Sequence, residues 1–142
     1  MQTKLPTAKE TVIVSLCSFG VPCRYHGKTE VRGHSIYKEK KIAALRDRYN
    51  ILPLCGEQLG GLPTPRPPCN VIEKEGQLRV VGRFNDIDYT IPYNRGANEI
   101  LRLARIFGVK KAYLLDKSPM CGKGYGILAR KLEENGIRVE KI

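Results

Sequence analysis

The sequence predicts an α/β fold, with a mostly parallel, Rossmann-like sheet, flanking helices and an inserted β-hairpin. Short apolar runs rich in β-branched residues alternate along the chain with longer segments of helical periodicity, and this order is typical of α/β proteins. The 142 residues contain no internal repeat, and this length suits one compact domain. We therefore expect a single α/β domain over residues 11–142, preceded by a flexible polar segment over residues 1–10.

The first half of the chain predicts two strands and one helix. Residues 12–16 form an apolar, β-branched run that predicts a buried strand, and the charged, Gly-rich stretch "VPCRYHGKTEVRG" predicts a loop. The segment "YKEKKIAALRDRYN" predicts a helix, because Ile42, Leu45 and Tyr49 fall on one helical face. The run "ILPL" predicts a second strand.

A proline-rich stretch and a hairpin follow. Residues 52–68, "LPLCGEQLGGLPTPRPP", end in four prolines within six residues, so after the "ILPL" run we expect neither a helix nor a central strand. The segment "CNVIEKEGQLRVVGR" predicts a β-hairpin, because two alternating runs flank "KEG".

The last third predicts two helices and two strands. The segment "NEILRLARIFG" aligns Ile100, Leu103, Ala104 and Phe107 on one helical face, and Gly108 suits the position just past its end. The run "KKAYLLD" predicts a third strand, and "ILARKLEENG" predicts a helix. The final segment, "IRVEKI", alternates like an edge strand.

The charge balance favours anionic partners. Lys and Arg number 25 against 14 Asp and Glu, which gives a net charge of +11. Nucleic acid, phosphorylated substrates and acidic proteins all fit such a chain, although a solvated basic surface explains the same charge. No apolar run is long enough to cross a membrane, and the first ten residues lack the features of a secretory signal. We therefore expect a cytoplasmic protein.

Three cysteines follow the three predicted parallel strands. Cys17 comes directly after the first strand, Cys55 directly after the second, and Cys121 a few residues after the third. Because parallel strands carry their ligand site beyond their carboxyl ends, these thiols are expected at one edge of one sheet.

The cysteine count and spacing exclude the common frameworks. An odd number in a chain read as cytoplasmic argues against a disulfide framework, and no pair has the Cys-x-x-Cys spacing of zinc ribbons. Of the remaining two cysteines, Cys23 lies in a loop and is able to approach the site. Cys69 begins the hairpin, so we expect it to be structural.

Three converging thiols leave several chemistries open. A closed zinc site needs four ligands, so a zinc-bound nucleic-acid module would require Cys23 as the fourth. Three thiolates with an open position suit a catalytic metal, or a 4Fe–4S cluster with one iron not held by protein. A non-catalytic cluster carrier or a sensor of iron or redox state would use the same thiols.

Three segments resemble the signature segments of the thiouracil desulfidase family, in the same order and over nearly the whole chain. They are "VSLCSFGVPCRYHG", "LCGEQLGGLPTPRPP" and "SPMCG". The resemblance implies a 4Fe–4S cluster held by Cys17, Cys55 and Cys121, with one open iron. It also implies an enzyme that removes sulfur from thiolated pyrimidines, such as 2-thiouracil or 4-thiouracil, without net redox change.

The resemblance extends to further residues of the proposed reaction. Ser118 matches a serine implicated in catalysis, and Glu57 matches the acid of the second segment and is our candidate for activating water. Arg24, Tyr25 and Arg66 are our candidates for binding substrate. The alternative for the two arginines is that they pin loops by ion pairs, and the alternative for Tyr25 is that it packs under the loop. The basic charge keeps a thiolated tRNA as an alternative to a small thiolated pyrimidine.

The chain also departs from the family pattern. His26 stands where an Asp is expected, Gly56 where a Pro is expected, and Met120 where a Ser is expected. The loop after Cys121 is shorter than usual. These departures concern the surroundings of the expected cluster rather than its ligands.

Overall fold

A computed structural model describes residues 8–142 and confirms the α/β prediction. Its centre is a four-stranded, fully parallel sheet with the strand order β4-β1-β7-β8. The four strands are β1 (Thr11–Ser15), β4 (Asn50–Leu54), β7 (Lys111–Leu114) and β8 (Arg138–Lys141).

The strand order reverses at β1. The chain first moves from β1 to β4 on one side, with Thr11 opposite Asn50, and it later returns to β7 on the other side, with Ile13 opposite Ala112. In open α/β sheets a ligand site lies beyond the carboxyl ends of the strands at such a reversal. The final strand, β8, pairs only with β7 and is an edge strand, as its alternating sequence predicts.

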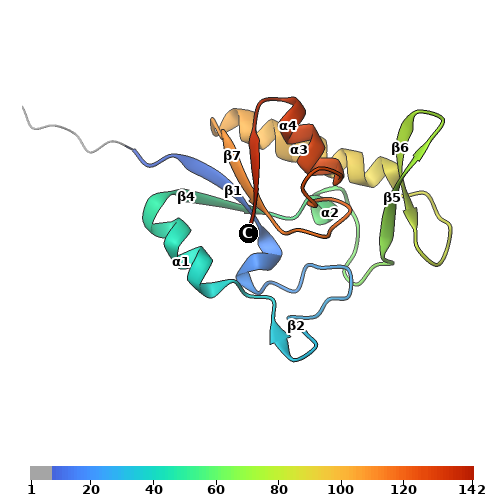
Figure 1. The fold of residues 1–142 in the computed structure, drawn as a ribbon, viewed down its shortest axis with the longest axis horizontal. Helices are drawn as coiled ribbons and strands as arrows, with labels where there is room; N and C mark the ends of the chain where they lie inside the picture. The colour runs from blue at the N-terminus through green and yellow to red at the C-terminus, as the bar shows by residue number, and fades with distance from the viewer. Residues whose placement is uncertain (1–7) are drawn as a thin grey trace, which may run out of the picture.

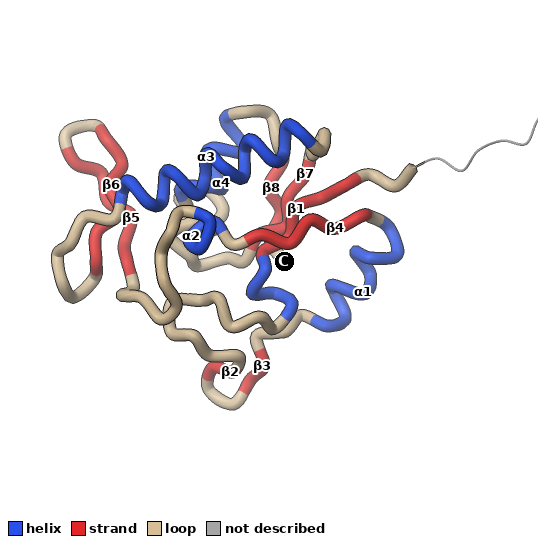
Figure 2. Tube along the Cα trace, turned by 180° about the vertical axis from the view of Figure 1, so that it is seen from behind, coloured by secondary structure: helices blue, strands red, loops and turns tan. Residues whose placement is uncertain are grey.

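Helices cover both faces of the sheet. The helix α1 (Glu39–Arg48) lies on one face, whereas α3 (Thr90–Ile106) and α4 (Ile127–Glu134) lie together on the other (Figures 1 and 2). Successive side chains of β1 follow this division: Val12 and Val14 belong to the core on the α1 side, and Ile13 belongs to the core on the α3 and α4 side. The sheet is therefore apolar on both faces.

The predicted face of α1 is confirmed. Ile42 is 1% exposed, Tyr49 at the end of the helix is 5% exposed, and Leu45 packs partly buried beside them. These side chains form the smaller of the two apolar clusters of the fold. This cluster packs α1 against the sheet. The loops before and after the helix are therefore held in place relative to the sheet.

The helix α3 begins eight residues before the predicted segment. Its first turn includes Pro92, which is tolerated there because the amide groups of a first turn have no partner within the helix. Its buried residues are Thr90, Tyr93, Gly96, Ala97, Ile100, Leu101 and Ala104. The predicted face was wrong at Phe107, which is 54% exposed at the end of the helix. Gly108 follows with a φ of 64°, as expected for a helix terminator.

The predicted hairpin forms a small sheet of its own. It consists of β5 (Cys69–Lys74) and β6 (Gln77–Gly82), which pair antiparallel and do not join the parallel sheet. Glu75 and Gly76 connect them with φ values of 52° and 76°, and two consecutive positive values are typical of a type I′ turn. The hairpin projects from the body beside the first turn of α3 (Figure 1).

Two expectations for the loops were wrong in detail. The stretch after "ILPL" was expected to contain no helix, yet Gly56–Leu59 forms a single helical turn, α2, directly after Cys55. This turn precedes the prolines, so their restricted backbone does not oppose it. The first predicted loop ends in two short paired strands, β2 (Glu30–Val31) and β3 (His34–Ser35).

The expected flexible segment, residues 1–10, lies mostly outside the described residues, because the description begins at residue 8. Over residues 8–142, none of the helices combines the length and apolar character that crossing a membrane requires.

Candidate functional site

A pocket opens at the carboxyl edge of the parallel sheet, between the sheet and the base of the hairpin. The loops that follow β1, β4 and β7 supply most of its walls. Its floor includes Tyr93 of α3, and its far side includes the two ends of the hairpin, Cys69 and Arg83. The pocket therefore lies where the reversal of strand order places a ligand site.

The structure brings Cys17, Cys55 and Cys121 together in this pocket. Cys17 lies in η1 (Leu16–Phe19), a turn of 3₁₀ helix that continues from β1. Cys55 follows β4 without a gap and caps α2, and Cys121 lies in the turn before α4. Each thiol thus comes from a different loop, and none of the three forms a disulfide.

The Cys121 thiol is tied to the central strand. The Ser15 hydroxyl, at the end of β1, donates to Cys121 Sγ at 3.6 Å and accepts from the amide of Leu115 at 2.9 Å. Ser15 therefore links the loops after β1 and β7. Burial raises the pKa of the Cys121 thiol to about 12, because the thiolate loses its hydration there and Glu57 is a nearby negative charge.

The Cys55 thiol is also held in its protonated form. Its pKa is raised above the ordinary value, first by the neighbouring Cys23 thiol and then by burial. Thiols crowded together resist ionisation because adjacent thiolates repel one another. Bound cations reverse this preference, since a coordinating thiol loses its proton outright.

The donor set fits a cluster better than a single ion. Among residues 8–142, no group of three or more His, Cys, Asp or Glu side chains is arranged to hold one metal ion. In an iron–sulfur cluster each iron takes its own thiolate, so the ligands stand apart around the cluster instead of converging on a point. Three free thiols from three loops around one pocket suit that arrangement.

The other two cysteines line the same pocket. The sequence left open whether Cys23 approaches the site. In the structure it lines the pocket and is 1% exposed. Cys69, which we expected to be only structural, is also buried in the pocket wall, and its thiol donates to the Pro67 carbonyl at 3.6 Å. All five cysteines of the chain therefore border one cavity.

A buried ion pair joins Glu57 and Arg66 beside the thiols. The Glu57 carboxylate lies in the first turn of α2, and Glu57 and Arg66 are 8% and 7% exposed. Burial raises the pKa of the Glu57 carboxyl above its ordinary value, and the Arg66 guanidinium partly offsets this effect. Removing either partner would leave an uncompensated charge in the protein interior.

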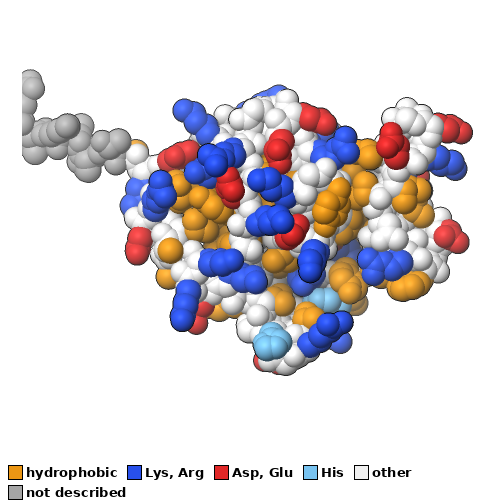
Figure 3. Space-filling model, in the orientation of Figure 1, with side chains coloured by type: hydrophobic (Ala, Val, Ile, Leu, Met, Phe, Trp, Pro, Cys, Tyr) orange, Lys and Arg blue, Asp and Glu red, His pale blue; other side chains and the backbone are white. Residues whose placement is uncertain are grey.

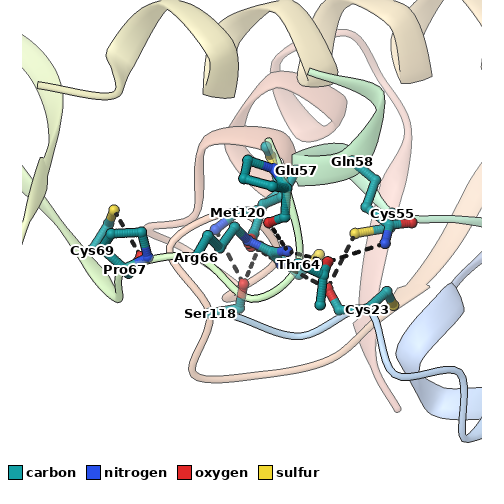
Figure 4. A network of polar contacts seen from close by, with 12 residues as sticks. Cys23, Cys55, Glu57, Gln58, Thr64, Arg66, Pro67, Cys69, Ser118 and Met120 are labelled. Atoms are coloured by element: carbon teal, nitrogen blue, oxygen red, sulfur yellow. Dashed lines mark hydrogen bonds and ion pairs between the residues drawn. The ribbon is translucent and has the colours of Figure 1, made fainter. Parts of the chain in front are cut away.

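Arg66 connects the proline-rich stretch to the loop of Cys23 (Figure 4). One terminal nitrogen donates to the Pro63 carbonyl at 3.3 Å and to the Thr64 hydroxyl at 3.0 Å. The other donates to the Cys23 carbonyl at 2.7 Å, and Nε donates to Glu57. Every nitrogen of the guanidinium thus has a protein acceptor.

Ser118 shapes the turn that carries Cys121. Its hydroxyl oxygen accepts hydrogen bonds from the amides of Met120 and Cys121, both at 3.2 Å. A serine hydroxyl has two lone pairs and one O–H group, so these two bonds occupy its lone pairs and leave the O–H as a donor. This O–H is close enough to Glu57 to lower the pKa of that carboxyl. Ser118 itself lines the pocket.

Arg24 and Tyr25 also line the pocket. Tyr25 is 39% exposed, and its ring meets the His26 ring edge to face, with the ring centres 4.8 Å apart. His26 turns away from the pocket, where its Nδ1 accepts from the amide of Lys28 at 2.9 Å. Burial lowers the pKa of His26, and the Arg24 charge adds to this effect.

Two departures from the family pattern touch each other. A Cβ atom on Gly56 would stand 3.0 Å from Cγ and Sδ of Met120, and both residues line the pocket. The Met120 side chain therefore fills the space that a side chain at position 56 would take. Neither residue was among the predicted site residues, although both departures were visible in the sequence.

Tyr93 and Lys117 also line the pocket and were missed. Tyr93 is 2% exposed, and its pKa is raised by burial. No sequence signal pointed to it, because it lies in the part of α3 that the periodicity did not predict. The sequence did offer a signal for Lys117, because this residue is adjacent to Ser118, a predicted site residue.

Comparisons with known proteins show the family to which the chain is similar. The profile of a family described as 2-thiouracil desulfurase matches residues 12–141. The uncharacterized protein YbbK of Bacillus subtilis (strain 168) is 30% identical over 147 aligned positions, which cover 90% of this chain and 93% of YbbK.

A solved structure is similar over nearly its full length. It is the 4Fe–4S-dependent thiouracil desulfidase TudS, which superimposes with a TM-score of 0.75 at 33% identity. The match covers 94% of this chain and 91% of TudS. The fold, the order of the signature segments and the family profile therefore agree, and the chain belongs to the 2-thiouracil desulfurase family.

Proposed function

We propose that this protein is a desulfidase that replaces the sulfur of a thiolated pyrimidine, such as 2-thiouracil or 4-thiouracil, with oxygen from water. The reaction is a hydrolysis: the thiocarbonyl carbon gains the oxygen of water and loses sulfur as hydrosulfide, without net redox change. The observation that carries the proposal is the meeting of three thiols with a buried carboxylate and a serine hydroxyl in one pocket. These side chains are Cys17, Cys55, Cys121, Glu57 and Ser118.

Cys17, Cys55 and Cys121 would hold a 4Fe–4S cluster. When bound, the cluster supplies one iron without a protein ligand, which is a Lewis acid for sulfur. The three loops contribute a fixed position for each thiol. Ser15 supports the one from Cys121, and the turn of α2 supports the one from Cys55.

Glu57 would accept the proton of the attacking water. Burial raises the pKa of its carboxyl, which makes it a stronger base than an exposed glutamate. Arg66 was expected to bind substrate. Because all its guanidinium nitrogens donate to protein acceptors, we propose that it positions Glu57 instead.

Ser118, Arg24 and Tyr25 would orient the pyrimidine. The O–H of Ser118 would donate to a ring nitrogen or oxygen of the substrate, because its lone pairs are occupied by the turn. Tyr25 offers an exposed aromatic face for stacking on the ring. Arg24 offers a cation to a ring oxygen, and no ion pair engages it within residues 8–142.

The direct test is turnover by anaerobically reconstituted protein. We expect a brown, iron-loaded protein that releases sulfide from 2-thiouracil or 4-thiouridine. Changing Cys17, Cys55 or Cys121 to Ala should remove most of the iron, whereas Cys69→Ala should retain it. A loaded protein that releases no sulfide would favour a carrier or sensor of iron–sulfur clusters, and the desulfidase proposal would fall.

A thiolated tRNA is the second candidate substrate. The net charge of +11 favours it, and Lys and Arg side chains are spread over the face in Figure 3. Phosphate contacts make affinity fall steeply with salt. Turnover of thiolated tRNA that declines steeply with added salt would support this substrate, whereas salt-independent turnover confined to the free base would exclude it.

A further inference from the structure

Cys23 is a fourth thiol beside the three proposed cluster ligands. It is 1% exposed and lines the same pocket, and it lies in the loop that follows η1, in the same connection as Cys17. Neither the fold nor the proposed reaction uses its side chain. A fully buried thiol among metal-binding thiols therefore needs an explanation of its own.

The surroundings of the Cys23 thiol are the other thiols. Within the described residues, its sulfur has no oxygen or nitrogen partner, whereas the Cys55 thiol reaches the Cys23 carbonyl at 3.9 Å. The neighbouring Cys17 thiol is the main cause that raises the pKa of Cys23, to about 11, whereas the hydrogen bond with the Cys55 thiol lowers it. Cys23 thus lies in the same connection as Cys17 and next to Cys55.

The backbone of Cys23 is fixed on both sides. Its carbonyl accepts from Arg66 at 2.7 Å, and its amide donates to the Val21 carbonyl at 2.7 Å. Arg66 also holds Glu57, so one guanidinium positions both the carboxylate and the fourth thiol. The thiol is therefore placed by the same contacts that build the rest of the site.

We propose that Cys23 is a displaceable fourth ligand of the metal centre, which occupies the iron position left open by Cys17, Cys55 and Cys121 while the pocket holds no substrate. This inference rests on the proposed function. The exchange would involve no oxidation: the Cys23 thiolate would leave the metal centre and take up a proton from solvent, and the substrate sulfur would bind in its place. Thiolates and thiocarbonyl sulfurs are both soft donors, so the two compete on similar terms.

Cys69 does not share these features and provides the matched control. It is buried in the same pocket, but its thiol donates to the Pro67 carbonyl at 3.6 Å and interacts with Tyr93. Cys69 belongs to the hairpin, whereas Cys23 belongs to a loop held by Arg66. A change at Cys69 therefore tests the effect of removing a buried thiol from this pocket without removing the proposed ligand.

The test measures iron loss on mild oxidation. An iron that lacks a protein ligand is the first to leave an oxidised 4Fe–4S cluster, and the remaining 3Fe–4S cluster has a characteristic EPR signal. The reconstituted wild-type protein, Cys23→Ala, Cys23→Ser and Cys69→Ala are each treated with ferricyanide in the absence of substrate. Iron content and the EPR signal are then recorded.

We expect the wild-type protein and Cys69→Ala to keep their iron. Both Cys23 variants should lose about a quarter of it, one iron in four, and show the 3Fe–4S signal. Equal conversion of wild-type and Cys23 variants would overturn the proposal, and so would equal retention, which would assign the fourth position to another group. Extensive conversion of the wild-type protein alone is sufficient to reject it, even if neither Cys23 variant folds.

The same experiment separates the inference from the proposed function. A wild-type protein that takes up no cluster would reject both. A protein that desulfurates thiolated pyrimidines but readily forms the 3Fe–4S cluster would retain the function and reject only the role of Cys23.

Discussion

The parallel sheet and the loops beyond its carboxyl edge are held together by different forces. In β1, Val12, Ile13 and Val14 are fully buried between helices on both faces, so apolar burial stabilises the sheet. In the loops, the Glu57–Arg66 ion pair and the hydrogen bonds of Arg66 hold the chain in place. Apolar burial therefore stabilises the sheet, whereas buried polar contacts stabilise the loops that form the site.

Because of this difference, the site depends strongly on one side chain, Arg66, whereas the sheet depends on no single residue. The apolar core spreads its stabilisation over many residues, each replaceable at a limited cost. Arg66 alone joins Glu57, Cys23 and the proline-rich stretch. We expect three substitutions to distinguish the two regions, with effects on stability that decrease from Arg66→Met to Ile100→Ala to Gly56→Ala.

The largest effect is expected for Arg66→Met. The change leaves the buried Glu57 carboxylate without its partner, and breaking a buried pair in this way costs about 3–5 kcal/mol of unfolding free energy. Urea unfolding of the metal-free protein measures this cost. Adding Glu57→Met should recover most of it, since the unpaired charge is gone, and a cost below about 1 kcal/mol for Arg66→Met would contradict the buried pair.

A similar but separable effect is expected for Ile100→Ala. Ile100 is 0% exposed under the sheet, so the truncation should cost about 2–5 kcal/mol of unfolding free energy. The matched control is Ile91→Ala on the same helix, because Ile91 is 71% exposed and its loss should change stability by less than about 0.5 kcal/mol.

The readout that separates this variant from Arg66→Met is iron content. The folded fraction of Ile100→Ala should take up as much iron as the wild-type protein, because the thiols are untouched. Reduced iron in folded Ile100→Ala would show that the sheet and the loops are not energetically separate.

The smallest effect is expected for Gly56→Ala. The new Cβ atom would crowd Met120 at 3.0 Å, and overpacking of this kind costs about 1–3 kcal/mol, toward the lower end because methionine adapts its shape. Thermal unfolding measures it. In a Met120→Ala background the cost should largely vanish, and an unchanged cost would show that the two residues do not share the space.

The sequence predicted the sheet and the meeting of the thiols because both depend on strong local signals. Apolar runs mark β1, β4 and β7, and a cysteine follows each of them within a few residues. Parallel strands then place these cysteines at one edge irrespective of details of the loops. The prediction for Cys17, Cys55 and Cys121 therefore depended on the parallel architecture of the sheet.

The early part of α3 was not predictable in the same way. Pro92 and Gly96 are poor helix formers, yet both lie within the helix. An added Cβ on Gly96 would stand 1.8 Å from the Gly56 carbonyl oxygen, so glycine is needed there for close packing against α2. Tertiary packing outweighs local preference in this segment, and Tyr93 was missed as a consequence.

The surroundings of the thiols also depend on contacts that no spacing reveals. Cys69 reaches the pocket because the hairpin stands apart from the sheet and turns its base toward the thiols. Arg66 was expected to face a ligand, but its partners lie in the Cys23 loop and in its own proline-rich stretch. Such partners depend on how loops fold over one another.

The bond between Ser15 and Cys121 joins residues 106 positions apart. A nascent chain that has exposed the first two thiols on leaving the ribosome still lacks β7 and the turn that brings the third. The site is thus completed late in synthesis, after the segments that form its other walls. The proposed cluster would therefore have to be assembled in a chain that is already folded.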